Sequence, residues 1–262
     1  MNAGLPVPQP KPLPDRLSDR PQILFTDVDD TLTWQGRVPV EAMQALYNLS
    51  AGGVDVVPVT GASAGWCDCL MKTWPIRAIV GENGAFYLYR TGNGVVQRRW
   101  LKPESSIAGD RRRLCQLSTD LQARYPDIRP TQDQPFRISE MAFDVGQAAT
   151  VDRQTAQEAT DWLRRQGLSA RLSSIHINAW VGDHSKASGA LAWLGDHGLS
   201  PDDSLFIGDS PNDESMFEHF RLTVGVANIR EFLPLMRHHP RYITRQQGGH
   251  GFAELAVRIA DV

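Results

Sequence analysis

Short apolar runs that end in polar residues recur along the chain. Residues 23–25 are wholly apolar and lead to Asp27, and the valine-rich residues 54–59 lead to Thr60. Runs without polar alternation are typical of strands buried on both faces of a parallel sheet. Pro39 suits the first turn of a helix between the two runs, and two glycines, 52–53, suit its end. This rhythm predicts an α/β fold.

The same rhythm continues to a third run and returns near the C-terminus. Residues 78–80 form the third predicted strand. The later predicted elements are a helix over 186–196, a strand over 205–207, a helix through 216–220 and a strand over 224–226. The fold class predicted for these parts is a Rossmann-like parallel sheet with helices.

The middle of the chain has a different pattern. Residues 86–89 and 95–96 flank a turn-rich connection that predicts a β-hairpin. Beyond it, the patterns predict helices over 111–125 and 152–166 and alternating strands over 136–145 and 174–181. We therefore expect an inserted α+β domain at 101–181 that interrupts a core made of 21–100 and 182–262.

The N-terminal segment is rich in proline. Six of the 17 prolines fall within the first 21 residues. Proline lacks the backbone donor that helix and sheet ladders need, so residues 1–20 are expected to be a disordered leader.

Charge and cysteine content limit the classes of partner. The 262 residues carry 27 Lys plus Arg against 30 Asp plus Glu, a net charge of −3, which argues against nucleic-acid or membrane-surface binding as the main activity. No apolar stretch approaches the ~20 residues that span a bilayer. Three cysteines are too few for a disulfide framework, so a reducing, cytoplasmic location is expected.

Acidic residues follow two of the predicted strands. Asp27 and Asp29 come after the first strand, and Asp209 and Asp213 come after the strand at 205–207. Ligands of open parallel sheets lie beyond the carboxyl ends of the strands, so these side chains are expected to converge. Clustered carboxylates repel one another, and oxygen ligands without Cys or His favour Mg²⁺ over zinc.

The two carboxylates of the first segment can have different roles. Asp27 suits a nucleophile that forms an aspartyl-phosphate, and Asp29 suits a general acid and base. The phosphoryl oxygens would need fixed donors and cations, for which Thr60, the backbone near Gly61, Lys186 and Mg²⁺ are the candidates.

These residues, in this order, resemble the four motifs of the haloacid dehalogenase-like (HAD) phosphatases. The motifs are Asp27-x-Asp29-x-Thr31, then Thr60, then Lys186, then Gly208-Asp209-x-x-Asn212-Asp213-x-x-Met216. The last pattern, and a cap between the second and third motifs, are similar to the Cof-like, sucrose-phosphate phosphatase-like type IIB branch. The resemblance covers the whole predicted core.

The resemblance implies a role for each matching residue. It implies that Asp27 is the nucleophile and a metal ligand, and that Asp29 is the acid and base, with its backbone carbonyl on Mg²⁺. It implies Thr60 and Lys186 on the phosphoryl group, Asp209 and Asp213 at the metal, and Asn212 as a supporting substrate contact. The sequence departs from the family at Asp30, where glycine is usual.

The expected substrate is a small phosphorylated metabolite, with a sugar phosphate as the first candidate. Gly61 in the core, and Arg137, Glu140 and Asn178 in the cap, are the further candidate substrate-binding residues. Neither nucleic acid nor membrane is an expected partner, and the chain is expected to be a monomer or a homodimer.

Two alternative functions stay open. A phosphomannomutase-like enzyme would share Asp27 and Asp29 but return the phosphoryl group to a sugar. A catalytically silent module would keep the pocket only to bind a phosphometabolite, which the presence of every motif residue disfavours.

Overall fold

A parallel sheet forms the centre of the core in the computed structural model, which describes residues 8–146, 148–173 and 175–260. Its strands lie in the order β1-β13-β12-β11-β2-β3, and every neighbouring pair is parallel. The strands are β1 (Lys11–Pro12), β2 (Ile23–Thr26), β3 (Asp55–Pro58), β11 (Ser204–Gly208), β12 (Leu222–Gly225) and β13 (Tyr242–Ile243). The predicted Rossmann-like α/β class is confirmed.

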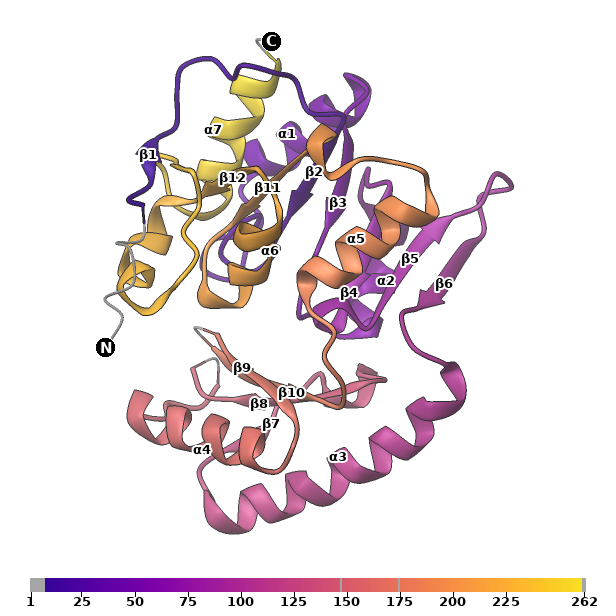
Figure 1. Ribbon diagram of the computed structural model, residues 1–262, viewed down its shortest axis with the longest axis vertical. Coiled ribbons are helices and arrows are strands. Elements are labelled where there is room, and N and C mark those ends of the chain that lie inside the picture. The colour runs from indigo at the N-terminus through magenta and orange to yellow at the C-terminus, as the bar shows by residue number, and fades with distance from the viewer. Residues whose placement is uncertain (1–7, 147, 174, 261–262) are drawn as a thin grey trace.

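Helices cover both faces of this sheet (Figure 1). Side chains alternate along β2, so that Leu24 packs into one hydrophobic cluster and Phe25 into another. The helices on the Leu24 side are α1 (Val40–Ala51), α2 (Ala64–Thr73) and α7 (Gly248–Ala260), and those on the Phe25 side are α5 (Lys186–Asp196) and α6 (Glu214–His219). Phe25 meets Trp193 of α5 edge to face, with ring centroids 5.9 Å apart.

A separate antiparallel sheet extends the core beyond β3. It consists of β4 (Ala78–Gly81), β5 (Phe86–Arg90) and β6 (Val96–Trp100). The hairpin β5–β6 agrees with the prediction. Strand β4 was expected to continue the parallel sheet, but it contacts β3 through one parallel bridge, Val59 to Val80, and otherwise pairs with β5.

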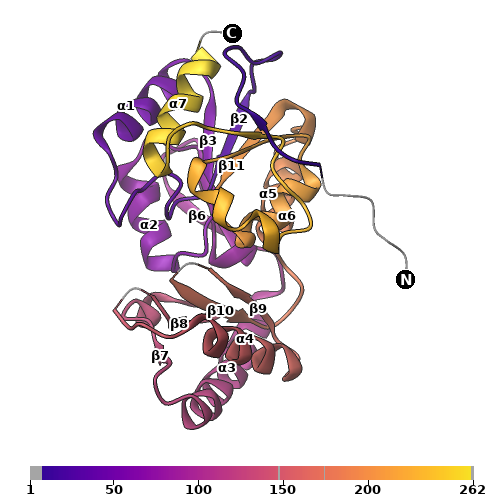
Figure 2. The same cartoon turned by 90° about the vertical axis from the view of Figure 1, so that its left-hand side faces the viewer.

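The chain between β6 and α5 folds as a second layer beneath the core (Figures 1 and 2). Its antiparallel sheet has the order β7-β8-β10-β9, with α3 and α4 on the face away from the core. The elements are α3 (Glu104–Arg124), β7 (Arg129–Pro130), β8 (Glu140–Asp144), α4 (Arg153–Arg165), β9 (Ser169–Leu172) and β10 (His176–Trp180). We keep 101–181 as the proposed cap.

Two predicted cap strands differ from the observed ones at their ends. The strand expected over 136–145 starts at Glu140, because Gln134–Phe136 forms a helical turn instead. The strand expected over 174–181 is β10, and Ser174 itself lies outside the described residues.

The predicted disordered leader is wrong for part of its length. Lys11–Pro12 forms edge strand β1 beside β13, and Leu13 and Leu17 are buried in the core. The amides of Lys11 and Leu13 donate to Arg241 and Ile243, so the missing donor of Pro12 falls on the unpaired side of the edge. Residues 1–7 of the predicted leader lie outside the described residues.

Among the described residues, no helix combines the length and apolar composition needed to cross a membrane.

Candidate active site

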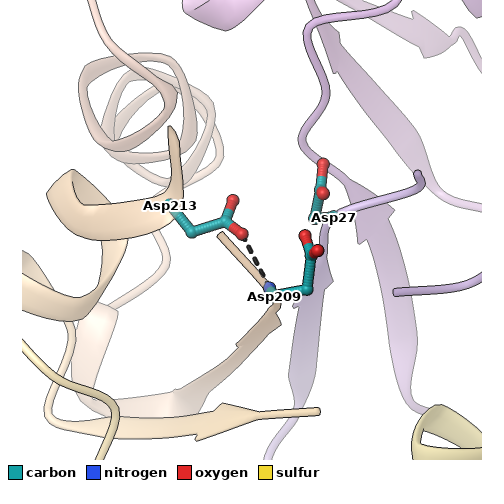
Figure 3. A group of neighbouring side chains, drawn as sticks. All are labelled: Asp27, Asp209 and Asp213. Atoms are coloured by element: carbon teal, nitrogen blue, oxygen red, sulfur yellow. Dashed lines mark hydrogen bonds between the residues drawn. The ribbon is translucent and has the colours of Figure 1, made fainter. Parts of the chain in front are cut away.

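The polar residues predicted at the strand ends meet at one edge of the parallel sheet. Asp27 follows β2 and Asp209 follows the neighbouring strand β11, and the Asp27 amide donates to the Ile207 carbonyl over 2.9 Å. Thr60 follows β3 on the other side of β2. Figure 3 shows the carboxylates of Asp27 and Asp209 beside each other, with that of Asp213 close by.

Asp27, Asp209 and Asp213 form a compact carboxylate cluster. One oxygen from each lies within 4.8 Å of the others, and all three side chains are buried. Asp213 sits at the end of a helical turn, Pro211–Asp213, where its Oδ2 accepts hydrogen bonds from the amides of Asp209 (2.9 Å) and Ser210 (3.2 Å). The loop after β11 therefore fixes one oxygen of Asp213 and leaves the other for the cluster.

Lys186 provides the positive charge inside the cluster. Its Nζ donates to Asp27 Oδ1 and to Asp213 Oδ1, each over 2.7 Å, and the side chain is buried. Burial alone would lower the pKa of Lys186, but Asp213 and Asp27 together raise it above its ordinary value. The lysine therefore stays charged at neutral pH.

The carboxylates are held at a high electrostatic cost. Burial raises the pKa of Asp27 to about 7 despite Lys186, and burial together with Asp27 and Asp213 raises the pKa of Asp209 well above its ordinary value. One lysine does not balance three buried carboxylates. An additional cation would relieve this repulsion.

The donor set of the cluster fits a hard divalent cation. Its ligand atoms are carboxylate oxygens without sulfur or imidazole, which is the set that Mg²⁺ takes in proteins. Asp27, Asp209 and Asp213 are therefore the side chains that would hold the ion.

Asp29, Thr60 and Gly61 lie in the loops that follow β2 and β3, at the same edge of the sheet as the cluster. Asp29 is exposed at the edge of the site, where the protein atoms packed around it raise the pKa of its carboxyl and Lys186 opposes the shift. Thr60 is buried, and its hydroxyl accepts a hydrogen bond from the Ala62 amide over 3.0 Å. The roles expected of Asp29 in proton exchange, and of Thr60 and Gly61 at the phosphoryl group, stay predictions.

The candidate cap residues Arg137, Glu140 and Asn178 are brought together with one another. All three are buried, and Glu140 accepts hydrogen bonds from Arg137 and from Asn178 Nδ2 (2.8 Å). Arg137 also donates to the Gly61 carbonyl over 2.7 Å and forms an ion pair with Asp133. Substrate contact by these residues stays a prediction, because most of the Arg137 donors already have protein acceptors.

Asn212 belongs to the same network. Its Nδ2 donates to Asn83 Oδ1 over 3.0 Å, and Asn83 Nδ2 donates to Glu140 Oε2 over 2.8 Å. The candidate substrate-binding residues of the core and cap are therefore connected through Asn83.

One residue at the carboxylate cluster was missed by the sequence argument. Asn228 lies just beyond β12, and its Nδ2 donates to Asp209 Oδ2 (3.2 Å) and to the Asp30 carbonyl (3.0 Å). Its Oδ1 accepts from the amide of Gly248, the first residue of α7. The signal was its place after a parallel strand, as for Asp27 and Asp209.

The backbone explains the unusual residue at position 30. Asp30 has φ +54°, in the left-handed region that glycine enters at least cost and that aspartate tolerates better than most residues. Its amide donates to Thr33 Oγ1 over 3.0 Å, which stabilises the turn.

Comparison with known proteins agrees with this geometry. A sequence profile of haloacid dehalogenase-like hydrolases matches residues 119–254. A phosphoglycolate phosphatase from Methanothermobacter thermautotrophicus is 28% identical over 237 residues, covering 90% of this chain and 97% of the relative. Another, from Methanoculleus marisnigri, is 27% identical over 209 residues, covering 78% and 83%.

Solved structures share the fold. A Thermoplasma acidophilum protein superposes with a TM-score of 0.72 at 18% identity, covering 93% of this chain and all of that one. The sucrose-phosphatase from Synechocystis, solved with sucrose and phosphate, gives a TM-score of 0.65 at 15% identity, covering 92% and 99%. Since the profile spans more than half of the chain, the protein belongs to the haloacid dehalogenase-like hydrolases.

Proposed function

We propose that the protein is a Mg²⁺-dependent phosphomonoesterase that acts on a small phosphorylated metabolite through an aspartyl-phosphate intermediate. The observation that carries the proposal is the position of Asp27: its Oδ1 accepts from Lys186, and its carboxylate lies within 4.8 Å of those of Asp209 and Asp213. A carboxylate beside a fixed cation and a cation-binding set suits attack on a phosphoryl group.

The first step transfers the phosphoryl group to the protein. A carboxylate oxygen of Asp27 forms a bond to phosphorus while the ester P–O bond breaks, and Asp29 gives its proton to the leaving alcohol oxygen. Lys186 balances charge on the transferred group, and Thr60 and the Gly61 backbone orient it. Mg²⁺, when bound, supplies Lewis-acid stabilisation of the phosphoryl oxygens.

The second step releases inorganic phosphate. Asp29, now ionised, takes a proton from water as the water oxygen attacks phosphorus, and the acyl-phosphate bond to Asp27 breaks. The raised pKa of Asp29 and its exposure to solvent support a role that needs both protonation states. Asp27 and Asp29 are then restored to their starting states.

A phosphorylated small carboxylic acid is the preferred substrate class. Four curated relatives that span most of this chain are named phosphoglycolate phosphatases, which supports 2-phosphoglycolate as the first compound to test. A sugar phosphate, the class expected from the sequence, is the second candidate. The expected cytoplasmic location and the monomeric or homodimeric state stay predictions.

The test is phosphate release with Mg²⁺ from a panel of 2-phosphoglycolate, sugar phosphates and p-nitrophenyl phosphate. We expect turnover by the native protein and its loss in Asp27→Asn, with the circular dichroism spectrum unchanged. Turnover of the same size in Asp27→Asn would contradict the proposal. A requirement for a sugar bisphosphate activator would favour the mutase, and binding without turnover of any compound would favour the silent module.

A further inference from the structure

A short core segment holds the cap at its boundary with the active site. Glu82, directly after β4, is fully buried, and its carboxylate accepts from the cap amides of Ile138 (2.9 Å) and Ser139 (2.7 Å) and from the Ser139 hydroxyl. It also accepts from the core amide of Ala64 over 3.1 Å. Three of these four donors belong to the cap, so most of the hydrogen bonds to this buried core carboxylate come from cap groups.

The backbone at this place is strained. Glu82 has φ +44° and Asn83 has φ +55°, two consecutive left-handed residues that are not glycine. Such a conformation is strained and persists only where the surroundings determine it. Here Glu82 accepts hydrogen bonds from Ile138 and Ser139 of the cap, and Asn83 donates to Glu140. The strained turn therefore places both side chains in contact with the cap.

Asn83 extends the contact toward the phosphoryl-binding candidates. It joins Glu140 of the cap to Asn212 of the core through hydrogen bonds of 2.8 and 3.0 Å. Glu140 in turn accepts from Arg137, which donates to the Gly61 carbonyl over 2.7 Å. Glu140 of the cap is therefore linked to the core loop that contains Gly61 and to the core loop that contains Asn212.

We propose that Glu82 and Asn83 form a clasp, a positioning device that seats cap residues 137–140 over the active site and thereby aligns Gly61 and Asn212. Its kinetic effect rests on the proposed phosphatase function, whereas the seating of the cap does not. A buried polar network that is fully paired specifies one arrangement of two layers more narrowly than apolar contact does. Displaced cap residues would leave the substrate poorly oriented and more exposed to water.

The first test is independent of catalysis and uses the full chain without substrate. Amide hydrogen exchange at Ile138 and Ser139 is compared in the native protein, Glu82→Gln and the matched control Glu104→Gln, whose side chain is exposed at the start of α3. Loss of a charged acceptor predicts exchange faster by about tenfold or more in Glu82→Gln. Native-like exchange in Glu82→Gln would overturn the clasp.

The second test separates positioning from loss of folded protein. With p-nitrophenyl phosphate and Mg²⁺, Glu82→Gln is expected to raise KM by about tenfold, with the circular dichroism spectrum unchanged. If Glu82→Gln does not fold, Ser139→Ala, which removes one donor, replaces it in both tests and is expected to shift exchange and KM in the same directions by a smaller factor.

Native-like exchange in the folded variant would overturn the clasp, and faster exchange with unchanged KM would overturn its effect on the active site. Failure of the phosphatase function gives a different result. Absence of turnover in the native protein would remove the kinetic test, and the exchange of Ile138 and Ser139 would still decide whether the clasp exists.

Discussion

Single polar side chains join segments that are far apart in the sequence. Lys186 contacts Asp27 and Asp213, and Asn228 contacts Asp209, the Asp30 backbone and the start of α7. Groups that hydrogen-bond a metal ligand fix its orientation and affect affinity for the ion even without touching it. Asn228 is therefore expected to orient Asp209 for the cation.

The first prediction concerns Asn228→Ala. Asp209 and the Asp30 carbonyl each lose the hydrogen bond from Asn228, so the Mg²⁺ concentration for half-maximal phosphatase activity is expected to rise about tenfold or more. A Mg²⁺ titration of turnover measures this change. The control is Asn48→Ala, which changes an exposed asparagine of α1. Equal Mg²⁺ requirements in the two variants would contradict the role given to Asn228.

The motif residues were predictable because each follows a strand whose apolar run is visible in the sequence. Asp27, Thr60 and Asp209 needed only the rule that strand ends share one edge. Asn228 also follows a parallel strand but was overlooked, whereas the role of Glu82 depends on cap amides that the strand-end rule does not place beside it. Asp30 is intermediate, since its departure from glycine was visible but its left-handed backbone was not.

The helical turn after β4 controls where α5 begins. Gly84 has φ +101°, and a Cβ there would lie 2.0 Å from the Ser185 carbonyl oxygen, next to Lys186. Gly189 of α5 packs against the same turn, where a Cβ would lie 2.9 Å from the Gly84 Cα. Close backbone approach, permitted by glycine, therefore positions the helix that carries Lys186.

The second prediction compares Gly84→Ala with Gly94→Ala. Both glycines have positive φ, but nothing lies within 4 Å of a Cβ at Gly94. Gly94→Ala is expected to cost about 1 kcal/mol of unfolding free energy from backbone strain alone. Gly84→Ala is expected to cost a further ~1–3 kcal/mol from overpacking and to lower kcat as Lys186 shifts.

Chemical unfolding and steady-state kinetics measure the two effects. Equal losses of stability in Gly84→Ala and Gly94→Ala, with native kcat in both, would show that the Gly84 contact does not position α5.

Strands and helices were predicted best where the sequence pattern has one interpretation, such as an unbroken apolar run or a hairpin with clear turn residues. Strands β2 and β11 are buried on both faces and β5–β6 form a hairpin with clear turn residues, so all of them agree with the prediction. Strand β1 was missed because its prolines argued against any ladder, although an edge needs donors on one side only. The parallel pairing expected of β4 is present only as the bridge between Val59 and Val80, while the other edge of β4 pairs with β5.

The molecule as a whole buries ionisable groups at both the active site and the cap. His176 in β10 and His184 in the linker to α5 are removed from water, which lowers the pKa of each to about 4. The charges near His176 are Arg137, Asp133 and Asp144. Those near His184 are Lys102, Asp183 and Asp110.

The third prediction is a loss of stability in mild acid. The unfolded chain binds protons at these histidines near pH 6.5, whereas the folded chain does not until about pH 4. The stabilising effect of the neutral histidines is therefore fully present above pH 6.5 and is lost as the pH falls toward 4. Between pH 7 and 5 the loss is on the order of 1–2 kcal/mol for each histidine.

The buried carboxylates have raised pKa values, and their protonation changes the stability in the opposite direction. The effect of the histidines is therefore measured by comparing the native protein with a variant that keeps the carboxylates but lacks both histidines. Urea unfolding of the native protein and of His176→Gln/His184→Gln is compared at pH 7 and pH 5. The native protein is expected to lose more stability than the double variant. An equal change in the two proteins would contradict the account of these histidines.

The parts of the fold come together in the chemistry given to Asp27. The parallel sheet places Asp27 beside Asp209, the turn after β11 adds Asp213, and the start of α5 adds Lys186. Each of these contacts would support the phosphoryl group that the proposed mechanism binds covalently to Asp27.

Rapid acid quenching of the native protein during turnover of p-nitrophenyl phosphate with Mg²⁺, followed by peptide mass spectrometry, tests that claim most directly. We predict a phosphoryl group on the peptide that contains Asp27, and none on that peptide from Asp27→Asn. Continued phosphate release by the native protein, with no phosphoryl group on Asp27 at any quench time, would contradict it.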